Sequence, residues 1–129
     1  MKKGAKEALE EFLKVKEEYL NEPVIVEGIK DKAALKQLGF KKIIMTDKAL
    51  YKVVEGITEK KVVILTDLDK TGKKIYYHLK KGLTDRGVVV DNKLRDLLFK
   101  TELRQVEGLT KYIETMESHT ETPVEKQDL

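Results

Sequence analysis

Short apolar runs that alternate with stretches of helical periodicity constrain the fold of this chain more than any other feature. Val24-Ile25-Val26 and Val62-Val63-Ile64-Leu65 are brief, continuous and rich in β-branched residues, as buried strands of parallel sheets are. Residues 42–46 and 88–90 are two further strand candidates. The spacing of apolar residues predicts helices over residues 5–20, 31–38, 48–54, 71–83, 92–99 and 106–116. This alternation predicts an α/β fold, with a compact four-stranded parallel sheet and helices on both of its faces.

The chain has 129 residues, a length that suits a single domain. We expect residues 1–22 to form an N-terminal helix that packs on the domain, and residues 23–117 to form the domain itself. Residues 118–129 are polar, contain Pro123 and have no periodicity, so we predict a disordered tail there.

The composition excludes several kinds of site. The chain has no Cys, which rules out disulfides and thiolate metal sites, and its two His residues disfavour a zinc centre. No apolar stretch reaches the roughly 18 residues that span a bilayer, and the N-terminus lacks the apolar core of a secretory signal. We therefore expect a cytoplasmic protein that does not contact membranes. The net charge of +3 is compatible with a polyanionic partner.

Acidic side chains directly follow two of the predicted strands. Glu27-Gly28 comes after the first apolar run, and Asp67-Leu68-Asp69 comes after the longer one. Because ligands of open α/β sheets bind beyond the carboxyl ends of the strands, we expect these carboxylates to gather at one edge of the sheet. Gathered carboxylates repel one another unless a cation lies among them, and Mg²⁺ prefers oxygen ligands. The sequence therefore predicts a Mg²⁺ site formed by Glu27, Asp67 and Asp69, in which Mn²⁺ can substitute.

Residues next to these acids are candidates for contacts with phosphate. Gly28 and Gly72 allow close approach of the backbone, and Gly72 also leads into a helix N-terminus, where free amides favour anions. Lys30 and Lys73 add positive charge near the two acidic segments. Arg95, beyond the fourth strand, has a planar guanidinium that suits phosphate, although a surface ion pair is an alternative.

Three further acids have two interpretations each. Asp31 either joins the site or caps the helix that begins there, and Asp47 either adds a carboxylate to the site or caps the next helix. Glu107 has the same two alternatives, a role in the site or in helix capping. Glu27 itself is suited to metal binding or to general acid–base chemistry on a phosphodiester.

The two acidic segments together carry a resemblance to a known family. Val26-Glu27-Gly28-x-x-Asp31, followed by Ile64-Leu65-Thr66-Asp67-x-Asp69-x-x-Gly72, resembles the Toprim domain of topoisomerases, bacterial-type primases and related nucleases. The similarity covers about residues 23–115 and is greatest to small stand-alone Toprim proteins and to the ribosomal-RNA-maturing ribonuclease. The resemblance implies a four-stranded parallel sheet, Mg²⁺ bound by Asp67 and Asp69, and Glu27 as a general acid or base.

The resemblance implies action on nucleic acid phosphodiesters, most plausibly as a nuclease with RNA favoured over DNA. The alternative is a non-catalytic module that binds a nucleic acid or a protein partner within a processing or repair complex. Topoisomerases carry a catalytic Tyr on a separate domain, for which 129 residues leave no room. The zinc-binding and helicase-binding segments of primases are missing from this sequence as well.

Overall fold

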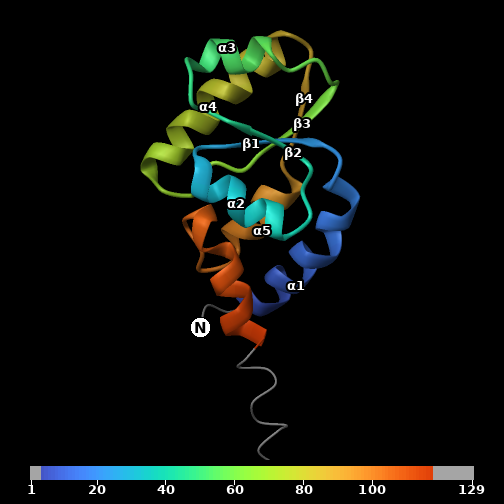
Figure 1. Cartoon of the computed structure of the whole chain (residues 1–129), viewed down its shortest axis with the longest axis vertical. Helices are drawn as coiled ribbons and strands as arrows, with labels where there is room; N and C mark the ends of the chain where they lie inside the picture. Colours follow the sequence, from blue (N-terminus) through green and yellow to red (C-terminus); the bar gives the residue numbers. More distant parts are fainter. Residues whose placement is uncertain (1–3, 118–129) are drawn as a thin grey trace, which may run out of the picture.

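The computed structural model describes residues 4–117, and a four-stranded, all-parallel sheet runs through the middle of this region (Figure 1). Its strands are β1 (Pro23–Val26), β2 (Lys42–Met45), β3 (Lys61–Ile64) and β4 (Val89–Asp91), in the spatial order β2-β1-β3-β4. The predicted fold class, an α/β protein with a four-stranded parallel sheet, is therefore confirmed.

Helices cover both faces of this sheet, as predicted. The helical elements are α1 (Ala5–Val15), η1 (Lys16–Tyr19), α2 (Ile29–Gln37), α3 (Leu50–Glu55), α4 (Lys70–Asp85), α5 (Lys93–Phe99), η2 (Val106–Gly108) and the helical residues 109–117. Helices α3 and α4 lie on one face, whereas α1, α2, α5 and residues 106–117 lie on the other (Figure 1). None of the helices in residues 4–117 combines the length and the apolar character that a membrane span requires. The tail that we predicted over residues 118–129 lies outside the described residues.

Two separate apolar cores hold the layers together. Every residue of β1 is buried, and its side chains alternate between the two faces. Val24 and Val26 pack with α1, α2 and α5, whereas Ile25 packs with α3 and α4. Burial on both faces explains why the central strands read as continuous apolar runs. Each buried large aliphatic or aromatic side chain contributes roughly 1.5–3 kcal/mol to this arrangement.

The order of the strands creates a switch point in the middle of the sheet. From β1 the chain passes through α2 to β2 on one side, and from β3 it passes through α4 to β4 on the other. The strands β1 and β3 are neighbours, with Ile25 opposite Ile64, and the Leu65 N–H donates to the Ile25 carbonyl at 2.8 Å. Crevices that bind ligands form at such switch points, beyond the carboxyl ends of the two strands.

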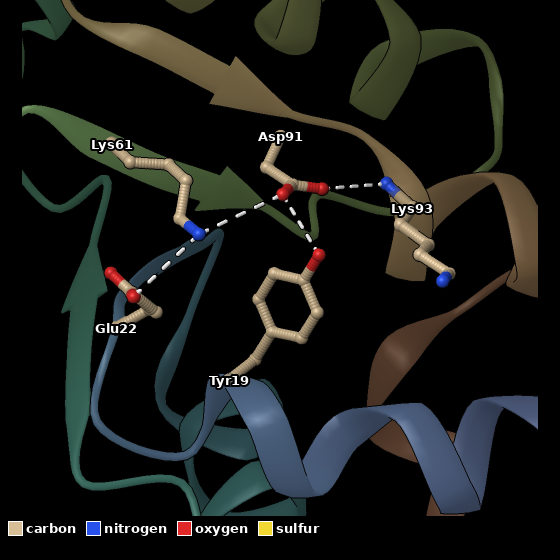
Figure 2. Close-up of polar contacts among 5 residues, drawn as sticks. All are labelled: Tyr19, Glu22, Lys61, Asp91 and Lys93. Atoms are coloured by element: carbon tan, nitrogen blue, oxygen red, sulfur yellow. Dashed lines mark hydrogen bonds and ion pairs between the residues drawn. The ribbon is translucent and has the colours of Figure 1, made fainter.

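A polar cluster ties η1 to the far edge of the sheet (Figure 2). The Tyr19 hydroxyl donates to Asp91 Oδ2 at 2.8 Å, and Asp91 Oδ1 accepts from the Lys93 N–H at 3.0 Å. The Lys61 ammonium lies 3.7 Å from Glu22 and 4.0 Å from Asp91. Asp91 thereby connects η1, β3, β4 and the start of α5, which holds the N-terminal helical segment against the domain.

Candidate metal centre at the carboxyl end of the sheet

Glu27 extends from the end of β1 across the switch point to the segment that follows β3. Its Oε2 accepts a hydrogen bond from the Asp67 N–H at 2.7 Å, although the two residues are 40 positions apart in sequence. Burial raises the pKa of the Glu27 carboxyl, the Asp67 N–H lowers it, and the charges of Asp67 and Asp69 raise it. The structure thus brings the first and second acidic segments into contact.

The segment Asp67-Leu68-Asp69 is held in place by backbone contacts. Asp67 Oδ1 accepts from the Val106 N–H at 2.8 Å, and Asp69 Oδ1 accepts from the Gly72 N–H at 2.8 Å as the N-cap of α4. Leu68 is buried between the two acids, as the alternation of an extended segment predicts, and its N–H donates to the Arg104 carbonyl at 2.7 Å. One carboxylate oxygen of each Asp is therefore fixed by a peptide N–H.

Gly72 has a different role from the one predicted. A Cβ atom at this position would lie 2.0 Å from the Asp67 carbonyl oxygen, so only glycine allows the acidic segment to pack on the first turn of α4. The buried Thr66 hydroxyl reinforces this packing by donating to the Gly72 carbonyl at 2.7 Å. The Gly72 N–H is occupied by Asp69, so the predicted open amide for phosphate is not present. The close approach is one of backbone to backbone, not of backbone to ligand.

Asp31 caps α2, one of its two predicted roles, and also lies among the other acids. The helix begins at Ile29, two residues earlier than predicted, with Gly28 as its N-cap, and Asp31 Oδ2 accepts from the Gly28 N–H at 3.0 Å. The backbone of Gly28 is extended, a conformation open to any residue. Burial raises the pKa of the Asp31 carboxyl, and hydrogen bonds from the Gly28 and Glu107 backbones lower it.

Five carboxylates are coupled electrostatically at this edge, and we call them the acidic rim: Glu27, Asp31, Asp67, Asp69 and Glu107. Burial is the largest cause of the raised pKa of Asp67, and the charges of Asp69 and Glu107 raise it further. Glu107 is exposed at the start of η2, where its charge also raises the pKa of Asp31. The acidic rim combines residues from both predicted segments with one from the C-terminal part of the domain.

The donor set of the acidic rim suits a hard cation. No three His, Asp or Glu side chains in residues 4–117 converge closely enough to form a complete three-ligand site. Mg²⁺, however, usually binds one or two carboxylates and keeps water or substrate phosphate as its other ligands. Within the described part of the chain, no Lys or Arg forms an ion pair with Glu27, Asp67 or Asp69. Glu27 and Asp67, which interact directly, together with Asp69 are the residues that fit Mg²⁺.

Arg95 does not lie where the sequence prediction placed it. Its side chain is 3% exposed, and its guanidinium donates to the Thr66 carbonyl at 2.7 Å and, at longer range, to the carbonyls of Ile64 and Asp67. A phosphate cannot reach a guanidinium in this position, and no surface ion pair forms there. The signal that we missed is the helical phase of α5, since Arg95 shares the buried stripe with Leu94 and Leu98.

The remaining predicted site residues lie around the acidic rim or away from it. Asp47 is exposed in the loop after β2, and its capping alternative is wrong, because α3 begins at Leu50 with Ala49 as its N-cap and has no side-chain cap. Lys30 is exposed on α2. Lys73 is exposed on the first turns of α4, and its ammonium lies 5.4 Å from the centre of the Phe99 ring.

Known proteins share both the sequence pattern and the fold of this chain. The family model of the Toprim domain matches residues 21–92. A UPF0292 protein of Methanocaldococcus jannaschii is 30% identical over 113 residues, a match that covers 81% of this chain and 88% of the relative. A UPF0292 protein of Archaeoglobus fulgidus is 31% identical over 94 residues, which covers 70% of this chain and 76% of that protein.

A solved structure of a protein from Aquifex aeolicus has the same architecture. It aligns with a TM-score of 0.65 at 31% sequence identity and covers 78% of this chain and 94% of its own. The match to the family model spans β1, β2, β3 and β4, and therefore includes Glu27, Asp67 and Asp69. The chain belongs to the Toprim domain family, whose members are metal-binding domains with functions related to nucleic acids.

Proposed function

We propose that this protein is a Mg²⁺-dependent nuclease that acts on nucleic acid phosphodiesters, with RNA favoured over DNA as the substrate. The observation that carries the proposal is the contact between Glu27 and the Asp67 segment at the switch point of the sheet. Carboxylates from the two central strands meet there, with Asp69 two residues further along. Paired acids of this kind serve both metal binding and proton transfer in phosphoryl chemistry.

Each carboxylate has a distinct role in this proposal. Asp67 and Asp69 would hold the Mg²⁺ through the oxygens that face away from their backbone partners. The bound ion supplies positive charge that polarises a phosphoryl oxygen and neutralises the charge that develops on the leaving oxygen. Glu27 would act as the general acid or base, because burial has already moved its pKa upward towards neutrality.

The substrate contacts that we propose lie on two sides of the acidic rim. Lys30 lines an open groove of about 660 Å³ between α2 and the C-terminal segment, together with Glu107 and Lys111. Lys73 projects from the first turns of α4 on the other side, next to the Asp69 cap. A phosphate backbone that passed over Gly28 and Asp69 would meet a lysine in both directions, and such contacts make binding sensitive to salt.

A second candidate function is a non-catalytic module that binds a nucleic acid end or a protein partner. The observation that favours it is the engagement of Asp67 and Asp31 by the backbone of η2, because both carboxylates already stabilise the fold. The same residues 4–117 hold no complete three-ligand metal site. In this alternative the acidic rim binds Mg²⁺ only to neutralise a phosphate contact, and no bond is broken.

A cleavage assay separates these two functions. Structured RNA, single-stranded DNA and double-stranded DNA would be incubated with the protein in Mg²⁺, in Mn²⁺ and in EDTA. The variants Glu27→Gln and Asp67→Asn/Asp69→Asn keep oxygen acceptors for the backbone N–H groups and remove only charge. We expect metal-dependent cleavage of RNA that falls at least 100-fold in both variants.

The controls determine how a negative result is read. The variant Asp85→Asn changes an exposed acid at the far end of α4, and it should cleave like the wild type. Cleavage that persists in both rim variants would show that a contaminating nuclease is responsible and would remove the support for catalysis. Metal-dependent binding of RNA without any turnover would favour the binding module.

A further inference from the structure

Arg95 is a buried cation that the proposed chemistry does not use. It is one of two charged residues, with Asp31, that are buried in the described part of the chain. Arg95 forms no ion pair with an Asp or Glu of residues 4–117. A buried guanidinium without a carboxylate partner is unfavourable unless its N–H groups find other acceptors. The identity of those acceptors is therefore informative.

The acceptors are main-chain carbonyls on both sides of the Asp67 Cα atom. Arg95 Nη1 donates to the Thr66 carbonyl at 2.7 Å and lies 3.5 Å from that of Ile64, and Nη2 donates to the Asp67 carbonyl at 3.4 Å. The Thr66 and Asp67 carbonyls belong to the two peptide planes that flank Asp67. Because each peptide is planar, fixing both planes fixes φ and ψ of Asp67, and with them the direction of its side chain.

The guanidinium is itself held in position by two aromatic rings. Its central carbon lies 4.5 Å from the centre of the Tyr76 ring and 5.5 Å from that of the Phe99 ring. The Tyr76 hydroxyl donates to Asn92 Oδ1 at 2.8 Å, which fixes the nearer ring. Stacking of this kind favours arginine over lysine, since a planar fork can face a ring and bridge two carbonyls at once.

The positive charge of Arg95 also lies beneath the acidic rim. Among the carboxylates whose charge favours the protonated guanidinium, Glu27 comes first and Asp67 second. The attraction is mutual, so Arg95 reduces the repulsion between these two acids when they are ionised. An apolar side chain of the same size would fill the space between α5 and β3 without either effect.

We infer that Arg95 is a positioning residue of the metal site, which fixes the backbone of Asp67 so that its carboxylate meets Glu27 and a divalent cation. This inference rests on the proposed function, because it concerns the binding of that cation. Arg95 touches neither the ion nor the substrate in this account. Its effect on the ion is transmitted through the two peptide planes and through its charge.

Calorimetric titration with MnCl₂ tests the inference, at a temperature well below the unfolding of each variant. We expect Arg95→Gln to weaken Mn²⁺ binding at least tenfold, and Arg95→Lys, which keeps the charge and loses the fork, to weaken it to a smaller extent. Arg104→Gln is the matched control, because Arg104 donates to the carbonyls of Thr101 and Leu103 away from the acidic rim. Leu98→Ala, a buried position on the same helix, controls for loss of stability.

Amide hydrogen exchange gives a second readout that does not depend on the metal. We expect Arg95→Gln to accelerate exchange of the Asp67 and Leu68 amides more than that of amides elsewhere in the sheet, and Leu98→Ala to show no such preference. If the wild type binds no Mn²⁺, the proposed function fails, and the exchange pattern still decides the role of Arg95. Mn²⁺ affinity of Arg95→Gln within twofold of the wild type would overturn the inference, as would an equal loss in Leu98→Ala.

Discussion

At the level of single residues, Gly72 and Thr66 determine how the acidic segment packs on the start of α4. The Asp67 carbonyl occupies the space that any side chain at position 72 would need, and the Thr66 hydroxyl bonds the Gly72 carbonyl from the buried side. The spacing of Asp67, Asp69 and Gly72 is therefore a requirement of backbone packing as much as of chemistry. The carboxylates depend on a residue that makes no contact with ligand.

The variant Gly72→Ala tests this dependence. We expect a loss of about 2 kcal/mol or more in the free energy of unfolding, because the new methyl group would displace the backbone of Asp67. Urea denaturation followed by circular dichroism measures the loss. Gly56→Ala is the control, since the nearest atoms to its Cβ lie at 3.5 Å and its φ of −77° suits alanine. A Gly72→Ala protein as stable as Gly56→Ala would contradict the packing argument.

At the level of elements, the segments outside the sheet anchor one another through polar contacts with few residues. Tyr19 of η1 reaches Asp91 at the end of β4 (Figure 2), and the backbone of η2 is held by Asp67. Both contacts join parts of the chain that are far apart in sequence. The N-terminal and C-terminal helical segments are thus bound to the same layer as α5, on one face of the sheet.

The bond between Tyr19 and Asp91 has a measurable pH dependence. Burial, followed by the contact with Asp91, raises the pKa of Tyr19 to about 12. The folded state thus favours the protonated phenol, so its contribution to stability is present below about pH 10, the ordinary tyrosine pKa, and is lost as the pH rises towards 12. Absorbance titration of phenolate should show one late tyrosine that is absent in Tyr19→Phe.

The same variant should be less stable at neutral pH. Loss of a hydrogen bond to a charged acceptor costs about 1–2 kcal/mol, because Asp91 keeps its other partners and loses only the phenol. The exposed Tyr77 provides the matched control, and Tyr77→Phe should unfold like the wild type. A late titration that survived in Tyr19→Phe would assign it to another tyrosine and remove this account of the cluster.

At the level of the whole molecule, the switch point of the sheet concentrates negative charge on a chain whose net charge is +3. Burial raises the pKa values of Glu27, Asp31 and Asp67 above their ordinary values of 4.5 and 3.8, because the metal-free fold disfavours their ionised forms. The acidic rim is therefore a source of instability that a bound cation can relieve. Function at this site opposes the stability of the empty fold.

This opposition predicts how stability depends on pH and on metal. In EDTA, the contribution of these three acids is present below about pH 4 and is lost as the pH rises through their raised folded values. Glu27→Gln should therefore gain stability relative to the wild type between pH 4 and 7. Mg²⁺ at tenfold excess over its Kd should stabilise the wild type by about 1.4 kcal/mol.

Denaturation at a series of pH values, with MgCl₂ or with KCl of equal ionic strength, measures both effects. Asp67→Asn/Asp69→Asn should show no stabilisation by MgCl₂ beyond that by KCl. If Glu27→Gln lost stability relative to the wild type as the pH rose, the sign of the predicted repulsion would be wrong. Equal stabilisation of wild type and double variant by Mg²⁺ would place the cation elsewhere.

The sequence by itself determined the fold class, the positions of the strands and helices, and the acids at the ends of β1 and β3. These features follow from local patterns: continuous β-branched runs, helical periodicity, and acids that directly follow apolar segments. The patterns could not show that Asp31 both caps α2 and joins the acidic rim, because the cap alone explains an acid at that position.

Only the tertiary structure decided the roles of Arg95, Gly72 and the backbone of η2. Arg95 and Gly72 were judged from side-chain chemistry as contacts for phosphate, yet each serves the backbone around Asp67. Such contacts depend on which main-chain atoms approach across the fold, and every residue carries the same N–H and C=O groups. A sequence pattern therefore identifies the acids of the site, whereas three-dimensional packing decides how they are held.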